Sequence, residues 1–261
     1  MTTVQQTAAR QQAAFPGGVA LTRLGVYDWE AADGICGGSP HMHTASTEAY
    51  LVLSGTGRVE TIRSSGYESY DLAPNDLLWF SPGTIHRLVN TDNLNILAIM
   101  QNGGLPEAGD AIMTFEPDIV ADAERYARTA SLDGGPAAVA NPAPGSGVTS
   151  RAAAARARRD AAFAGYELLK EAALAGDFAV VEQFQRDAVR LVQAKVSGWQ
   201  NLWRETIAPE PARTERWLAD LAQGGFSHFR DAAVSRTVPV NTGPIFGMCG
   251  LLQKWDIGPQ S

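Results

Sequence analysis

Residues 41–55, HMHTASTEAYLVLSG, place three potential metal ligands within one short stretch. Two of the chain's four histidines stand here, as His41 and His43. In an extended strand, residues i and i+2 lie on the same face, so both imidazoles project to one side. Glu48 follows and offers a carboxylate oxygen. We therefore predict that these three side chains converge on a common point.

A second stretch, PNDLLWFSPGTIHRLVN at 74–90, contributes a third histidine, His86. Three neutral imidazole nitrogens and one anionic oxygen suit a borderline divalent ion such as iron(II), manganese, nickel, cobalt or zinc. The prediction is one divalent metal ion held by His41, His43, Glu48 and His86.

The region around both stretches alternates short apolar runs with Gly, Pro, Asn and Ser turn signals. Many short strands at close spacing are typical of a β-barrel or sandwich. The predicted strands are Val19–Glu30, Glu48–Leu53, Gly57–Arg63, Tyr70–Leu72, Leu77–Phe80, His86–Asn90 and Leu94–Gln101.

The spacing His41-x-His43-(x)4-Glu48-(x)6-Gly55, followed by Pro82, Gly83, His86 and Asn90, resembles the two conserved motifs of the cupin superfamily. The resemblance covers roughly residues 19 to 101. Three positions depart from it. Asn75 replaces a glycine, Ser81 replaces a proline, and the glycine usually found before the first histidine is shifted. The resemblance implies a small β-barrel or jelly roll with a metal ion inside it.

Past residue 130 the composition changes. The stretch SLDGGPAAVANPAPGSG at 131–147 is typical of a linker or long surface loop. A helix is then predicted from an N-cap at Ser150 to a stop at Gly176, and Asp177 is predicted to cap the next helix. A third helix is expected over Pro211–Gln223. The apolar tail that follows lacks helical periodicity and is expected to return to the barrel as a strand or to join a partner subunit.

The predicted fold class is thus α+β, a cupin β-barrel or jelly roll followed by a mainly α-helical C-terminal region. The predicted division is an arm at 1–18, the barrel at 19–120, a linker at 121–149 and a helical region with an apolar tail at 150–261. Packing or dimerisation is the favoured role of the helices. A basic face containing Arg151 and Arg156 leaves a DNA-binding helix pair as an alternative.

The net charge is −7. Residues 1–150 carry 7 Lys/Arg and 16 Asp/Glu (net −9), while residues 151–261 carry 14 and 12 (net +2). Such an acidic front half argues against nucleic acid as the partner of the barrel. The N-terminus resembles no signal peptide, and no apolar stretch is long enough to span a bilayer. Cys36 and Cys249 show no disulfide or metal-binding spacing, so a cytoplasmic location is expected.

Four protein ligands leave about two octahedral positions open, which suits catalysis. Tyr50 shares the face of Glu48 by the period of two, so we predict it as a catalytic acid or base, with packing against a ligand as its alternative role. Either Trp79 or Phe80 should wall the interior. Arg87 should face away from it, which favours a small, largely apolar or aromatic substrate. The lone His228, between aromatic residues, is expected to be structural.

By analogy with the cupins, the resemblance implies an iron-type oxygenase as the favoured function. The alternatives are a non-redox isomerase, lyase or decarboxylase on the same centre, and a non-catalytic small-molecule sensor. A homodimer is the expected assembly.

Overall fold

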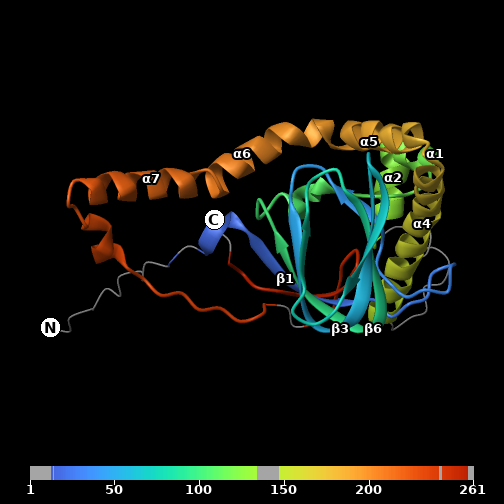
Figure 1. Cartoon of the computed structure of the whole chain (residues 1–261), viewed down its shortest axis with the longest axis horizontal. Helices are drawn as coiled ribbons and strands as arrows, with labels where there is room; N and C mark the ends of the chain where they lie inside the picture. Colours follow the sequence, from blue (N-terminus) through green and yellow to red (C-terminus); the bar gives the residue numbers. More distant parts are fainter. Residues whose placement is uncertain (1–12, 14, 134–146, 241–242, 258–261) are drawn as a thin grey trace.

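A computed structural model describes residue 13 and residues 15–133, 147–240 and 243–257. A β-barrel occupies the centre of the molecule, and helices cover one side and one end of it (Figure 1). The remaining helices form an arm that projects away from the barrel. This architecture confirms the predicted α+β class, with a strand-rich first part and a helical second part.

All strands of the described chain belong to one antiparallel sheet that curls into the barrel. Its main order is β4-β3-β6-β1-β9-β8; β5 pairs with β3, and β2 lies between β6 and β7. The strands are β1 (Ala20–Val26), β2 (His41–His43), β3 (Glu48–Arg63), β4 (Gly66–Leu72), β5 (Leu77–Phe80), β6 (Ile85–Met100), β7 (Ala111–Met113), β8 (Ile245–Phe246) and β9 (Gly250–Lys254).

Strands β3 and β6 are continuous, so the prediction of two separate strands in each of these regions was wrong. The register between them shifts near Ser54 and Thr56, where the ladder is bulged. Gly55 adopts a φ of +76°, which a side chain would disfavour. A bulge bends a strand without ending it. The turn signal at Ser54-Gly55 therefore marks a bend within β3, at the point where its pairing with β6 changes register.

Six α-helices stand in the described part of the chain: α1 (Pro117–Val120), α2 (Ala123–Ala130), α4 (Gly147–Ala175), α5 (Phe178–Val192), α6 (Val196–Thr206) and α7 (Pro209–Ala222). The predicted stop at Gly176 is confirmed, with a φ of +76°. So is the Asp177 cap, whose side chain accepts from the Ala179 amide. The prediction of Ser150 as the N-cap was wrong, because α4 begins at Gly147 and Ser150 already lies within its first turn.

Helix α4 packs directly on the outer face of the barrel wall that contains β2 and the ends of β3 and β6. Met42, Ile62 and Ile85 share one buried cluster with Phe163 and Tyr166 of α4. Gly165 makes the close approach feasible, since a Cβ there would lie 2.2 Å from the Thr114 carbonyl oxygen. The helical region and the barrel therefore share a hydrophobic core.

The C-terminal tail returns to the barrel as the β8–β9 hairpin, and β9 pairs with β1. This is one of the two outcomes expected of the tail. Of the predicted linker, residues 123–130 form α2, and residues 134–146 lie outside the described part, as do residues 1–12 of the predicted arm. The four-part division of the chain stays a prediction. Among the described helices, none is both long and apolar enough to cross a membrane.

Candidate metal centre

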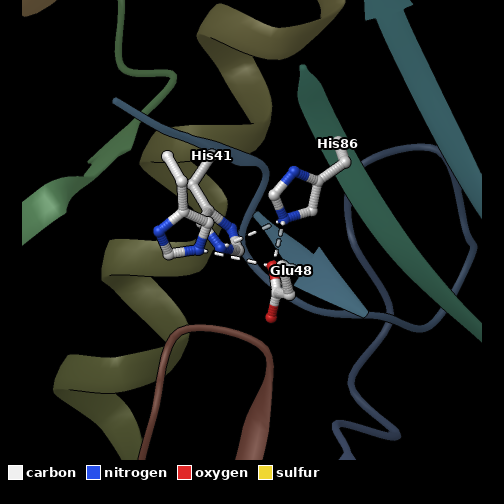
Figure 2. A group of neighbouring side chains, drawn as sticks. His41, Glu48 and His86 are labelled. Carbon is white, nitrogen blue, oxygen red and sulfur yellow. Dashed lines mark hydrogen bonds and ion pairs between the residues drawn. The ribbon is translucent and has the colours of Figure 1, made fainter. Parts of the chain in front are cut away.

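Three strands bring the four predicted ligands together at one point inside the barrel (Figure 2). His41 and His43 come from β2, Glu48 from the start of β3 and His86 from the start of β6. His41 pairs with His86 in the antiparallel ladder, which places the two rings side by side. One donor atom from each of the four residues lies within 4.8 Å of the others. All four side chains are buried.

Backbone carbonyls orient two of the imidazoles. His41 Nδ1 lies 2.9 Å from the Ser39 carbonyl oxygen, and His86 Nδ1 lies 3.1 Å from that of Thr84. A carbonyl only accepts, so each Nδ1 carries the proton and donates it. In the neutral rings, each Nε2 then presents a lone pair. These two Nε2 atoms lie 3.2 Å apart and face each other, an arrangement that a shared cation stabilises.

Glu48 completes the donor set. Its Oε2 lies 3.3 Å from Nε2 of both His43 and His86 and, despite burial, accepts no hydrogen bond from any of the described residues. Two ligand atoms bound to one ion at ~2.1 Å lie about 3.0–3.4 Å apart when the angle at the ion is between a right angle and the tetrahedral angle. Three of the six donor pairs, at 3.2–3.3 Å, meet that requirement, and all four donor atoms lie within 4.8 Å of one another. The residues therefore fit a divalent ion held by three nitrogens and one oxygen.

The electrostatics of the cluster favour positive charge at its centre. Burial, reinforced by the nearby His86 and His43, holds the pKa of His41 well below its usual value. Burial alone would also lower the pKa of His43, but Asp110 and Glu48 reverse this and raise it to about 9. Burial opposes ionisation of Glu48, yet its contacts with His43 and His86 hold the pKa of that carboxyl well below its usual value. A divalent cation would supply the positive charge that stabilises the buried carboxylates of Glu48 and Asp110.

Asp110 is a site residue that the sequence analysis missed. It lies fully buried, with Oδ2 3.4 Å from His43 Nδ1. Its Oδ1 accepts from the amides of Thr44 and Ala45, at 2.8 and 2.7 Å. A carboxylate behind a ligating histidine orients the ring and raises its basicity. No local signal could reveal this residue, because the contact with the Thr44 loop spans 66 residues.

Asp110→Asn should weaken metal binding about 10- to 100-fold, because His43 would lose the anionic partner behind its ring. Competition with a metal-binding dye would measure the affinity for zinc or manganese. Asp118→Asn is a matched control, since Asp118 is exposed on α1 and pairs only with Arg125 among the described residues. Equal affinities of the Asp110 variant and the unaltered chain would contradict this role.

Apolar and aromatic groups wall the ligands. Phe80 packs on His86 with ring centroids 4.3 Å apart, and on Tyr50 at 5.4 Å. Phe80 is therefore the inward residue of β5, while Trp79 is exposed. Tyr50 is fully buried. Burial, together with the negative charge of the adjacent Glu48 carboxylate, raises the pKa of Tyr50 well above its usual value.

The C-terminal hairpin closes over the His41 side of the site. The Met248 carbonyl oxygen accepts from the Ser39 amide at 3.0 Å and from Ser39 Oγ at 2.8 Å. Ser39 in turn accepts from His41. Cys249 Sγ lies 3.8 Å from His41 Nδ1. Residues more than 200 positions from the first ligand therefore support it.

Arg87 faces away from the site, as predicted, and is buried beneath α4. His228 also lies apart, near the end of the arm, where its ring stacks on Trp217 and meets Phe229 edge-on. Two pockets outside the barrel, of about 370 and 400 Å³, contain none of the four ligands. One lies between α6 and the loop at 102–105; the other lies among α1, α4 and α5. Any reaction at the ligand cluster would therefore take place inside the barrel and not in either of these pockets.

Residues 29–100 match the model of the cupin domain family. Together with the antiparallel barrel, this match shows that the N-terminal part of the chain is a cupin domain. The resemblance predicted from the histidine motifs is therefore confirmed. No curated protein is significantly similar to the chain.

Several solved structures are similar to a limited part of the chain. A Klebsiella pneumoniae protein with a double-stranded β-helix domain is 13% identical over 34% of this chain and 70% of its own, with a TM-score of 0.28. The Streptomyces nucleoside dehydratase Pac13 is 17% identical over 34% of this chain, with a TM-score of 0.26, and the match spans 62% of its length. A mutant of Bacillus subtilis oxalate decarboxylase is 20% identical over 26% of this chain and 18% of its own, with a TM-score of 0.24. At these scores the likenesses assign no activity to this chain.

Proposed function

We propose that the protein is a metal-dependent enzyme that acts on a small, largely apolar or aromatic molecule, with iron-dependent oxygenase chemistry favoured. The observation that carries the proposal is the convergence of three histidine nitrogens and the unpartnered Glu48 Oε2 inside the barrel. Four protein ligands leave room on a six-coordinate ion for a substrate and a small co-substrate.

An iron(II) ion in this donor set supplies redox chemistry with dioxygen, whereas zinc or manganese supplies Lewis-acid polarisation of a carbonyl. The protein residues bind the substrate and exclude water. Phe80 and Met100 line the interior, and Glu48 pairs in the ladders with both. No lysine or arginine among the described residues forms an ion pair with Glu48 or Asp110. This supports a neutral, apolar substrate over a phosphorylated one.

Tyr50 is the proposed acid–base group of the reaction. Its raised pKa keeps the hydroxyl protonated, so it serves as a proton or hydrogen-bond donor. This property also favours the second candidate, a non-redox isomerase, lyase or decarboxylase, in which a protonated phenol stabilises a developing oxyanion.

Oxygen uptake by protein loaded with iron(II), manganese(II) or zinc tests the proposal against a panel of small aromatic and carbonyl compounds. We expect substrate-dependent oxygen consumption with iron, and a loss of about 10²- to 10⁴-fold in turnover for Tyr50→Phe with metal content retained. Turnover without oxygen consumption would replace the oxygenase by the non-redox candidate. Tight binding without turnover would replace both by a sensor.

A further inference from the structure

The outer face of one barrel wall is apolar and has no covering element among the described residues. The two ladder rows on this face run Trp79–Ala49–Ile99–Leu21 and Leu77–Leu51–Leu97–Arg23 across β5, β3, β6 and β1. Their inward neighbours, such as Tyr50 and Ala98, are buried in the barrel. We call this surface the outer strip: Leu21, Leu51, Leu77, Trp79, Leu97 and Ile99. Trp79 is 67% exposed and Leu77 55% exposed, while the other four side chains of the strip are half-buried.

The opposite wall is different, because α4 covers it and shares a core with it. A contiguous exposed apolar surface usually marks an interaction site. The outer strip is therefore a surface for which the described part of this chain provides no cover.

A second apolar surface lies on the arm formed by α6, α7 and η4 (Ser227–Asp231). Figure 1 shows α7 extending well beyond the barrel. Among the described elements outside the arm, none packs appreciably against α7. An isolated helix of 14 residues is marginal in water, so α7 needs a packing partner. The large exposed apolar side chains of the arm are Val196, Trp203, Trp217, Leu218, Leu221, Phe226 and Phe229.

The end of the arm is already ordered by its own contacts. Asp220 Oδ2 accepts from the amide and hydroxyl of Ser227 at 3.0 and 2.9 Å. The His228 ring stacks on that of Trp217 with centroids 5.3 Å apart, and the Arg213 guanidinium carbon lies 5.3 Å from the centroid of the Trp217 ring as its cation–π partner. Side chains fixed before association lose little entropy on binding. The arm thus presents preorganised aromatic groups of the kind that anchor protein interfaces.

We propose that two copies of the chain form a two-fold dimer in which the arm of each copy lies across the outer strip of the other. The five adjacent strands β5, β3, β6, β1 and β9 span about 19 Å at a spacing of ~4.8 Å. Helix α7 is about 21 Å long at 1.5 Å per residue, so its length matches the width of the sheet. Because each copy contributes one arm and one strip, the contacts close on themselves.

Area and charge support a second copy as the occupant. Four aromatic side chains of the arm, each about half exposed, offer roughly 400 Å² at 150–250 Å² per ring. Each copy contributes both its arm and its outer strip, so the surface that it buries approaches the ~800 Å² per partner of a standard interface. Residues 196–240 carry five arginines and five carboxylates. This balance disfavours nucleic acid or an anionic membrane as the partner. The proposal is independent of the metal chemistry.

Sedimentation velocity on the full chain, on two double variants and on one single control variant tests the dimer. The arm variant is Leu218→Ser/Phe229→Ser, the strip variant is Leu77→Ser/Trp79→Ser, and the control is Leu174→Ser, an equally exposed leucine on α4. We expect the unaltered chain and the control to sediment at twice the 27.8 kDa chain mass. Each double variant should dimerise at least about 100-fold more weakly. All replaced side chains are exposed, and circular dichroism would verify that each variant is folded.

Mixing the two double variants separates this arrangement from strip-to-strip packing. A mixed dimer keeps one intact arm on one intact strip, whereas either variant alone keeps none. The mixture should therefore associate more tightly than either variant alone. The proposal is overturned by an unaltered chain that stays monomeric at about 100 µM, by double variants that dimerise normally, or by a mixture that gains nothing.

Discussion

Replacing His43 with alanine is expected to lower bound metal from about one ion per chain to less than about a tenth of that. His43 supplies one of three convergent nitrogens and lies between the carboxylates of Glu48 and Asp110, at 3.3 and 3.4 Å. Its loss removes a ligand and breaks the link to the supporting carboxylate. The barrel should still fold, because neither buried apolar cluster includes His43.

Elemental analysis of protein purified from metal-supplemented medium would measure this loss. His228→Ala is the matched control, since it removes a histidine that lies apart from the cluster and should leave the metal content unchanged. Unchanged metal in the His43 variant would refute the ligand assignment. Equal losses in both variants would show that the measurement reports folding and not ligation.

Arg87→Ala is expected to destabilise the protein by about 1.5–3 kcal/mol, because it removes the charged hydrogen bonds to Asp33 and one of the three cations, beside Arg58 and Lys170, that surround the buried Glu60. The Arg87 guanidinium bonds Asp33 through both terminal nitrogens, at 2.7 and 3.2 Å, and lies 3.6 Å from Glu60. It also lies 4.4 Å from the centre of the Phe163 ring of α4. This one side chain therefore joins the barrel wall, the loop at 31–40 and the covering helix.

Urea denaturation of metal-free protein would measure the change and avoid any contribution from the metal next to His86. Arg63→Ala is the control, because the Arg63–Glu68 ion pair is exposed and should contribute no more than about 1 kcal/mol. Equal midpoints for the two variants would show that the buried network contributes little to stability.

Much of the metal centre was predictable because its signals are local. The two-residue period of a strand places His41 and His43 on one face, and it also sends Arg87 away from the site that His86 faces. Helix boundaries at Gly176 and Asp177 follow from backbone conformation and capping, which depend on a few neighbouring residues. The positions of β3 and β6 were recognised, but their continuity was not, because a bulge and a turn share the same residue preferences.

What the sequence alone determined is which side chains can serve as donors and on which face of its strand each one lies, since these properties depend on short-range geometry. Tertiary structure alone decided what supports and covers them. Asp110 reaches the Thr44 loop across 66 residues, and Cys249 reaches His41 across 208. Such contacts arise only when the strands pair and the hairpin closes over the barrel, so no local periodicity encodes them. The same reason explains why one barrel wall is covered by α4 while the described residues leave the outer strip uncovered.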